Sequence, residues 1–367
     1  MKKIKVGVLF GGQSAEHEVS LVSARSVVSA IDQSKYEISL IGITHQGQWL
    51  LAEDQNKALS YKTVDEQNLP AVTLDYTGSD RQIRHNQQGV ISDAITDLDV
   101  IFPVLHGPHG EDGTVQGLFE LANLPYVGCG VAASALAMDK VLAKQAFSAA
   151  EIPQTDYEAY RVHQWQQDES AMIEKIEAQF VYPVFIKPAN MGSSVGITKA
   201  HDRRELAKGV RLAFDYDLKI IIEESAQGFR EVECAILGNE NPQASIVGEI
   251  IPGNEFYDYE TKYIDDKSEL IIPANISLAA AEKVQGLAIK AFQAIDGSGL
   301  ARVDFFVSED NQTVYINEVN TMPGFTPISM YPKLWQASGI EYADLIDKLI
   351  SLGIHKSKQK QKLKVKI

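Results

Sequence analysis

Two apolar runs near the end of the chain are each interrupted by polar side chains. Arg302 and Asp304 interrupt the first run, and Glu318 and Asn320 interrupt the second. Side chains alternate between faces along a strand, so each pair occupies one face, and a turn near 310–311 would bring position 304 opposite position 318. Carboxylate and amide oxygens suit Mg²⁺, which completes its shell with phosphate oxygens and water. The alternative is a surface hairpin in which Arg302 only pairs with Asp304.

A lysine followed by a small-residue loop forms a second group. Lys187 ends an apolar run and precedes the loop at 190–196, which contains Ser193 and Ser194. Backbone N–H groups of such a loop can lie along phosphate oxygens. It is not a Walker A loop, because GxxxxGK[ST] occurs nowhere in the chain. A plain turn is the alternative.

Three acidic residues accompany the next apolar run. Glu223 and Glu224 end this run, and Glu231 follows within another strand-like segment. Acceptors at a strand end can take an adenine amino group, and a nearby carboxylate can hold ribose hydroxyls. A solvated, acidic strand end explains these residues equally well.

Glycine-rich loops follow two strand-like runs in the first third of the chain. Glu16, after Gly11-Gly12, would attract a substrate ammonium, or would simply complement a helix dipole. His106 lies in LHGPHGEDG, at a strand end where α/β sheets bind ligands, and it could equally be a structural hydrogen-bonding residue.

A polar segment at 257–263 is rich in tyrosine and lacks the character of a core element. It is typical of a mobile lid. On a lid, Lys262 could reach a transferred phosphate and Tyr263 could gate the cavity. An ordinary loop is the alternative.

The elements that must position these groups alternate between strand and helix patterns. This alternation predicts a parallel α/β domain followed by two α+β lobes. The expected domains are 1–130, 131–226 and 227–367, with the lid at about 252–268. Residues 46–95 are expected to be irregular. The expected strands are 4–10, 38–44, 100–105, 181–187, 195–199, 219–223, 231–237, 244–251, 300–307 and 313–319. The expected helices are 19–31, 132–150, one that Asp202 and Glu205 open by a capping box and that ends near 214, and 277–295.

Composition narrows the class of protein. The chain has 367 residues and a net charge of −15, which argues against nucleic-acid binding. Its basic stretch, 355–366, is interpreted as a solvated end. The two cysteines, Cys129 and Cys234, have no metal-ligand spacing. The opening apolar run is too short for a signal peptide, and no segment has the length of a membrane span, so a cytoplasmic protein is expected.

Taken in order, these motifs resemble the D-alanine–D-alanine ligases of the ATP-grasp superfamily. The resemblance extends over essentially the whole chain, through GGQSAEHEVS, LHGPHGEDG, MDK, KPANMGSSVG, FYDYETKY and NEVNTMPG. It implies a parallel α/β domain followed by a two-lobed ATP-grasp fold. It also implies ATP-dependent ligation of two D-alanine molecules through a D-alanyl phosphate, for peptidoglycan precursors. Two Mg²⁺ ions, with Mn²⁺ as a substitute, and a homodimer are implied as well.

The resemblance also assigns roles around the nucleotide. Lys140 and Lys187 would hold the ATP phosphates, with Ser194 and the loop backbone closing over them. Glu223 would meet adenine beside Glu224, and Glu231 would meet ribose, although one extra residue separates these positions here. The residues implied for the two Mg²⁺ ions are Asp304, Glu318 as the bridging ligand, and Asn320. Lys262 would contact the transferred phosphate.

A further set of implied roles concerns the amino acids. Glu16 would take the first ammonium and would be linked through Ser193 to Tyr263, with His106 beside the substrates. Arg302 and the Gly324 backbone would stabilise the oxyanion. Ser329 and Met330 would hold the second carboxylate. Tyr263 favours D-alanine over D-lactate as the second substrate, whereas D-serine is less well excluded because Met330 is near that subsite.

Three other classes of protein fit less well. An ATP-grasp ligase for another substrate pair would not need Glu16, His106 or the tyrosine-rich lid. An NAD-dependent oxidoreductase would fit the opening pattern, but GxGxxG is missing and the site at 302–320 would be unexplained. A non-catalytic binding module would not need side chains that can bind phosphate, metal and amino acid at every one of the positions that the family uses.

Overall fold

The computed structural model describes residues 2–52, 60, 62–64, 69–76, 81–87, 89–251 and 269–364. The predicted lid at about 252–268, including Lys262 and Tyr263, lies outside the described residues.

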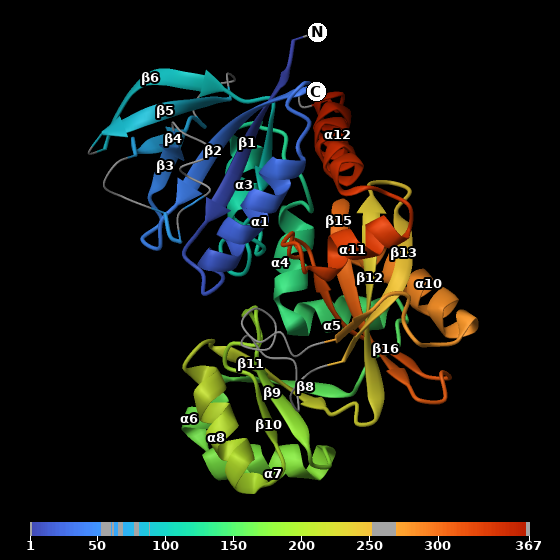
Figure 1. Ribbon diagram of the computed structural model, residues 1–367. Coiled ribbons are helices and arrows are strands. Elements are labelled where there is room, and N and C mark those ends of the chain that lie inside the picture. Colours follow the sequence, from blue (N-terminus) through green and yellow to red (C-terminus); the bar gives the residue numbers. More distant parts are fainter. Residues whose placement is uncertain are drawn as a thin grey trace.

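A mainly parallel sheet forms the centre of the N-terminal domain, drawn in blue and cyan in Figure 1. The strand order is β3-β2-β1-β7, with β1 parallel to β2 and β7 and with β3 antiparallel to β2. These strands are β1 (Ile4–Gly11), β2 (Tyr36–Ile43), β3 (Trp49–Ala52) and β7 (Val100–Pro103). Val6, Val8 and Phe10 face a core shared with α1 (His17–Ala30) and α12 (Tyr342–Gln361), whereas Leu9 faces the other side, where α3 (Thr114–Leu121) packs.

Residues 46–95 contain regular structure, so the expectation of an irregular segment is wrong. Besides β3, they include an antiparallel sheet of β4 (Val72–Leu74), β5 (Gln82–Gln87) and β6 (Val90–Asp97). Val72, Leu74 and Ile83 are buried in the same cluster as Leu9. Polar residues interrupt β5 and β6 throughout, which gives too weak an apolar alternation to be recognised in a sequence.

The central lobe has its own sheet and its own core. The order is β10-β9-β11-β8, with antiparallel neighbours. Its elements are β8 (Tyr157–Arg161), α6 (Val162–Gln167), α7 (Glu169–Gln179), β9 (Val184–Pro188), β10 (Thr198–Ala200), α8 (Arg203–Phe214) and β11 (Lys219–Glu224). The strand expected at 195–199 is therefore shorter and begins later. Asp202 caps α8 by accepting from Glu205 N at 2.8 Å, as predicted, but Glu205 accepts from His201 N rather than from the cap itself.

The C-terminal lobe is built on a five-stranded sheet in the order β14-β13-β12-β15-β16. The strands are β12 (Phe229–Gly238), β13 (Gln243–Ile251), β14 (Glu269–Ile271), β15 (Gly299–Ser308) and β16 (Val314–Asn320). One face packs against α10 (Leu278–Ala294), and the other packs against α11 (Met330–Ala337) and α12. Figure 1 shows α12, in red, reaching back to the N-terminal domain.

The helix expected at 132–150 is two helices, α4 (Val131–Met138) and α5 (Lys140–Ala149). Asp139 separates them in an extended conformation and accepts hydrogen bonds from Val141 N at 3.1 Å and Leu142 N at 3.2 Å. An aspartate side chain competes with helical hydrogen bonding in this way, so the single-helix prediction is wrong. Both helices, which the sequence groups with the central lobe, contribute to the core of the C-terminal lobe through Ala133, Ala137 and Phe147. The domain boundaries expected from the sequence stay a prediction.

The basic stretch at 355–366 is not simply a solvated end, because α12 extends through most of it. Lys356 is partly buried, with its Nζ 5.4 Å from the centroid of the Tyr126 ring. Lys360 forms an ion pair with Glu120. A parallel α/β domain followed by two α+β lobes is therefore confirmed, with the C-terminal helix packed back onto the first domain. Among the described residues, every helix is too short or too polar to span a bilayer.

Candidate active site

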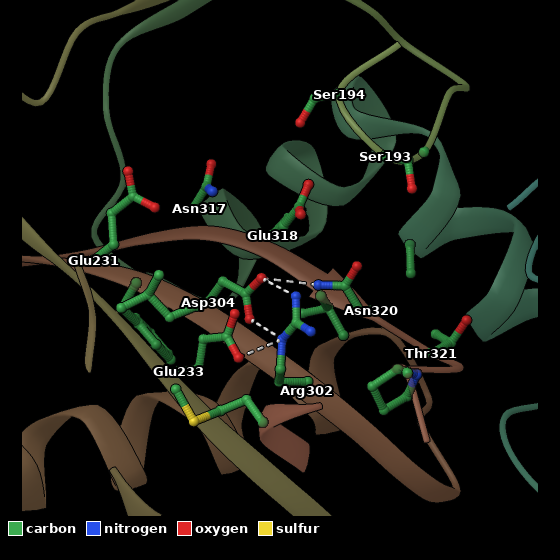
Figure 2. A pocket seen from close by; sticks show the side chains of 18 of the residues that line it. Ser193, Ser194, Glu231, Glu233, Arg302, Asp304, Asn317, Glu318, Asn320 and Thr321 are labelled. Carbon is green, nitrogen blue, oxygen red and sulfur yellow. Dashed lines mark hydrogen bonds and ion pairs between the residues drawn. The ribbon is translucent and has the colours of Figure 1, made fainter. Parts of the chain in front are cut away.

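A cavity of about 510 Å³ is lined by residues of the N-terminal domain and of both lobes. Figure 2 shows part of it. Lys262 and Tyr263 lie outside the described residues, but all of the other predicted site residues line this cavity. They are Glu16, His106, Lys140, Lys187, Ser193, Ser194, Glu223, Glu224, Glu231, Arg302, Asp304, Glu318, Asn320, Gly324, Ser329 and Met330.

The hairpin of β15 and β16 supplies the floor of the cavity. Asp304 pairs with Glu318, and Arg302 pairs with Asn320, which confirms the predicted register. A bulge follows, because Phe305 pairs with Ile316 and leaves Asn317 extra. Ile316 points into the core, and without the extra residue Glu318 would point there too. The bulge therefore turns Glu318 and Asn320 towards the cavity.

Arg302 is held between two carboxylates. Its Nε and Nη2 donate to Asp304 at 2.7 Å each, and Nε lies 3.0 Å from Glu233 Oε2 (Figure 2). Burial by itself would lower the pKa of Arg302, but Asp304 and Glu233 raise it well above its usual value. The guanidinium is thus a fixed positive charge beside the cavity.

The donors at this hairpin fit Mg²⁺. Asp304, Glu318 and Asn320 present two carboxylates and one amide to the same cavity. Asp304 accepts from Arg302 and from Asn320 Nδ2 at 3.0 Å, but a carboxylate has about four lone-pair sites and keeps capacity for a cation. No cluster of three or more His, Cys, Asp or Glu side chains suited to a metal occurs in the described part of the chain. Phosphate oxygens and water would therefore have to complete the shell, as is usual for Mg²⁺.

The Gly/Ser loop lies against the start of α5. Lys140 Nζ donates to Met191 O at 2.6 Å, which holds the loop over the cavity. Ser193 and Ser194 have positive φ values of 50° and 60°. Successive residues in unusual backbone conformations can present N–H groups to an anion, so this loop suits phosphate better than a plain turn does.

A buried carboxylate, Glu223, lies between two lysines, Lys144 and Lys187. Glu223 is 3% exposed, and its Oε2 accepts from Lys187 Nζ at 2.8 Å. Lys144 Nζ lies 3.9 Å from Glu223 Oε1. Burial would raise the pKa of Glu223, but Lys144 and Lys187 hold it below the usual value. The alternative of a solvated strand end is therefore wrong for Glu223, although Glu224 beside it is exposed.

Glu16 belongs to the N-terminal domain but reaches both neighbouring loops. A Cβ built on Gly107 would lie 2.8 Å from Glu16 Oε2, and one built on Gly192 would lie 3.1 Å from it. Gly107 also has a φ of +75°, which favours glycine. The two glycines make room for a carboxylate that is 7% exposed and that lines the cavity near the Gly/Ser loop.

His106 connects three segments in a buried network. Its Nδ1 lies 3.0 Å from Met322 O, and its Nε2 lies 3.0 Å from Ser23 Oγ. Phe325 N donates to the same Ser23 oxygen at 3.2 Å. A carbonyl can only accept, so Nδ1 carries the proton and Nε2 accepts from Ser23 in a neutral ring. Burial lowers the pKa of His106, which agrees with this form. His106 thus has the structural role that the sequence left open, and it also lines the cavity.

Gly324 and Ser329 are neighbours in the loop before α11. A Cβ built on Gly324 would lie 2.6 Å from Ser329 Oγ, so a larger residue would collide with that hydroxyl. Ser329 Oγ accepts from Thr326 N at 3.0 Å. Met330, the first residue of α11 and the neighbour of Ser329 in the chain, lines the same cavity. The residues predicted for the oxyanion and for the second carboxylate therefore lie together.

Three charged residues at the site were missed in the sequence. Glu233 is two residues after Glu231, and the period of a strand could have placed it on the same face. Glu111 accepts from Gly107 N at 2.9 Å and Met322 N at 3.1 Å, and burial together with the nearby Glu16 raises its pKa to about 8. Lys144 follows Lys140 by one helical turn, a spacing that gave no sign of its partner Glu223.

Comparisons with known proteins identify the family of the chain. Two family models match the chain: "D-ala D-ala ligase N-terminus" at residues 5–129 and "D-ala D-ala ligase C-terminus" at residues 146–351. The D-alanine–D-alanine ligase of Bacillus cytotoxicus is 50% identical over 367 residues and 100% of both chains. That of Acetivibrio thermocellus is 50% identical over 371 residues and 96% of both chains.

Solved structures give the same result. The VanG D-Ala:D-Ser ligase from Enterococcus faecalis has a TM-score of 0.85 and 39% identity, over 96% of this chain and 100% of that one. The D-alanine–D-alanine ligase from Coxiella burnetii has a TM-score of 0.85 and 37% identity, over 99% of this chain and 97% of that one. The protein therefore has the ATP-grasp fold, and its chain belongs to the D-alanine–D-alanine ligase family.

Proposed function

We propose that this protein uses ATP to join two D-alanine molecules into D-alanyl-D-alanine for peptidoglycan precursors. The observation that carries this proposal is the convergence of three chemistries in one cavity. The lysines and the Gly/Ser loop suit phosphates, the acidic hairpin suits a divalent cation, and Glu16 suits an ammonium.

The first step makes the carboxylate of one D-alanine reactive. A free carboxylate is a poor electrophile, so its oxygen attacks the γ-phosphorus of ATP and gives D-alanyl phosphate and ADP. Lys140, Lys187 and the N–H groups around Ser194 neutralise charge on the transferring group. Asp304, Glu318 and Asn320 would hold two Mg²⁺ ions, or Mn²⁺ as a substitute, which would neutralise further phosphate charge when bound.

The second step forms the peptide bond. The neutral amine of the second D-alanine attacks the acyl carbon, and the C–N bond forms. The C–O bond to phosphate then breaks, and the proton lost by the amine leaves with the phosphate. Arg302 and the Gly324 N–H stabilise the negative oxygen of the tetrahedral intermediate. Glu16 holds the first ammonium, and Ser329 with Met330 N–H holds the second carboxylate. Lys262 and Tyr263 would act from the lid.

Two further parts of the proposal rest on the resemblance to the family. We propose that Glu223 and Glu224 meet adenine and that Glu231 meets ribose. We also propose that the protein acts in the cytoplasm, where ATP is present, and that it acts as a homodimer.

The test is phosphate release from ATP with D-alanine alone and then with D-serine or D-lactate added, with products identified by mass. D-alanyl-D-alanine as the main product supports the proposal. A mixed D-alanyl-D-serine or D-alanyl-D-lactate product would retain the mechanism but overturn the assigned second substrate. Absence of D-alanine-dependent turnover in a folded, ATP-binding sample would contradict the proposed function.

A further inference from the structure

Lys144 is a buried cation behind the wall of the active-site cavity. Its side chain is 2% exposed and does not line the cavity. Its Nζ lies 3.3 Å from Thr155 Oγ1 and 5.3 Å from the centroid of the Tyr157 ring. Burying an ammonium is unfavourable unless an opposite charge lies nearby, and here that charge is Glu223, at 3.9 Å.

Glu223, however, already has a closer partner. Lys187 donates to the other carboxylate oxygen at 2.8 Å, which would be enough for one negative charge. Unlike Lys144, Lys187 lines the cavity. The carboxylate therefore has one cation on the ligand side and a second cation on the protein side.

The second cation, Lys144, is needed to keep Glu223 ionised when a phosphate enters the cavity. A phosphate carries more negative charge than one carboxylate and draws the Lys187 ammonium towards itself. Glu223 would then be left buried with a weakened partner, and an uncompensated buried carboxylate takes up a proton. Lys144 cannot follow the phosphate, because it is enclosed between Thr155 and Tyr157.

We propose that Lys144 is a positioning residue that keeps Glu223 ionised when Lys187 is engaged by ATP, so that Glu223 can accept the amino group of adenine. This inference rests on the adenine role of Glu223 in the proposed function. Lys144 itself touches no ligand. Its effect is on which base is recognised, because an ionised carboxylate accepts a hydrogen bond but cannot donate one.

The test compares ATP with inosine triphosphate, whose base carries a carbonyl oxygen in place of the amino group. In Lys144→Met, Glu223 becomes protonated in the complex and can donate to that oxygen. We expect the preference for ATP, as the ratio of kcat/KM values, to fall about tenfold, which is the scale of one hydrogen bond to a charged group. Most of this change should appear in KM for ATP. An unchanged ratio would overturn the inference.

Three further variants separate the outcomes. Lys144→Gln keeps a donor for Thr155 and removes only the charge, so it should show the same fall even if Lys144→Met folds poorly. Lys208→Met, on an exposed position of α8, should keep the wild-type ratio. Adding Lys144→Met to Glu223→Gln should change the ratio no further, because the two residues act as one unit.

Failure of the inference and failure of the proposed adenine contact give different results. If Glu223→Gln lowers the preference but neither Lys144 variant does, only the role of Lys144 is wrong. If Glu223→Gln leaves the preference unchanged, the adenine contact is wrong, and the inference falls with it. Melting temperatures of the ligand-free Lys144 variants should stay near that of the wild type, since Lys187 and Glu223 still balance each other.

Discussion

At the scale of single residues, the acidic hairpin separates positive from negative charge within a few ångströms. Arg302 is fixed by Asp304 and Glu233, whereas Glu318 faces the cavity one strand away. Charges in a partly buried site interact more strongly than charges in water. This separation supports the proposal that the hairpin holds a cation and a developing oxyanion at neighbouring positions.

The metal assignment predicts the behaviour of Glu318→Ala. Removing the Glu318 carboxylate, which would help to hold Mg²⁺, should reduce Mg²⁺-dependent ADP release by about a hundredfold or more, because it removes charge stabilisation of the phosphoryl transfer. The measurement is turnover as a function of Mg²⁺ concentration. Glu309→Ala, at the exposed turn of the same hairpin, should stay active. An active Glu318→Ala variant would contradict the metal assignment.

The buried neutral His106 predicts a dependence of stability on pH. Its pKa is lowered in the folded state, so below about pH 6.5 the unfolded chain binds a proton that the folded chain does not. The contribution of neutral His106 to the unfolding free energy is therefore fully present above pH 6.5 and is lost as the pH falls. Between pH 7.5 and 5.5 the wild type should lose about 1 kcal/mol more unfolding free energy than His106→Gln does.

Urea denaturation at the two pH values, without ligands, measures this difference. His163→Gln, an exposed position, should behave like the wild type. Equal losses for the wild type and His106→Gln would mean that His106 accepts a proton in the folded protein.

At the scale of elements, interruptions of regular strands and helices decide where functional groups point. The bulge at Asn317 reverses which face of β16 receives the next side chains, so an apolar strand can end in Glu318 and Asn320. Asp139 acts similarly at a helix. It ends α4, starts α5, and pairs with Lys219 of the central lobe. As a result, Lys140 begins a helix that faces the Gly/Ser loop.

Asp139→Ala tests this arrangement. We expect a loss of about 2 kcal/mol of unfolding free energy, from the lost cap and from the Lys219 ammonium left without its carboxylate. KM for ATP should rise several-fold, because Lys140 loses its fixed starting position. Urea denaturation and steady-state kinetics measure the two effects.

The matched control is Ser277→Ala. Ser277 caps α10 by accepting from Ala280 N at 3.2 Å, away from the cavity, so its loss should reduce stability by about 1 kcal/mol without changing KM for ATP. If both variants change KM equally, the effect of Asp139 is one of general stability.

At the scale of the whole molecule, the lobes differ in how they are joined. One hydrophobic cluster runs from the N-terminal sheet through α12 and α11 into the C-terminal sheet. Phe102 of β7 packs in it, with its ring centroid 5.7 Å from that of Phe325, beside Gly324. The central lobe has a separate core around Leu206 and Ile220. The first and last parts should thus unfold together and the central lobe by itself.

Hydrogen exchange tests this division. Leu206→Ala should lower local stability by about 2–5 kcal/mol and should speed exchange within residues 157–224 only. Phe102→Ala should lower stability by about 3–5 kcal/mol and should speed exchange both in the N-terminal sheet and around residues 322–350. A uniform increase across the chain for either variant would contradict two separate units.

The sequence by itself determined features that depend on local periodicity. Strand alternation and one turn placed Asp304 opposite Glu318, and a cap residue placed the start of α8. The order of the motifs was enough to identify the family. These features need only neighbours along the chain, or two strands joined by a short turn.

Only the tertiary structure decided which distant groups meet. Lys144 and Glu223 are far apart in the sequence, and so are Glu111 and Met322, and no local period relates them. Glu16 reaches the Gly/Ser loop because two glycines in different domains leave room for its carboxylate. The physical reason is that local periodicity sets which face a side chain occupies, whereas long-range packing of faces decides its partner and therefore its charge state.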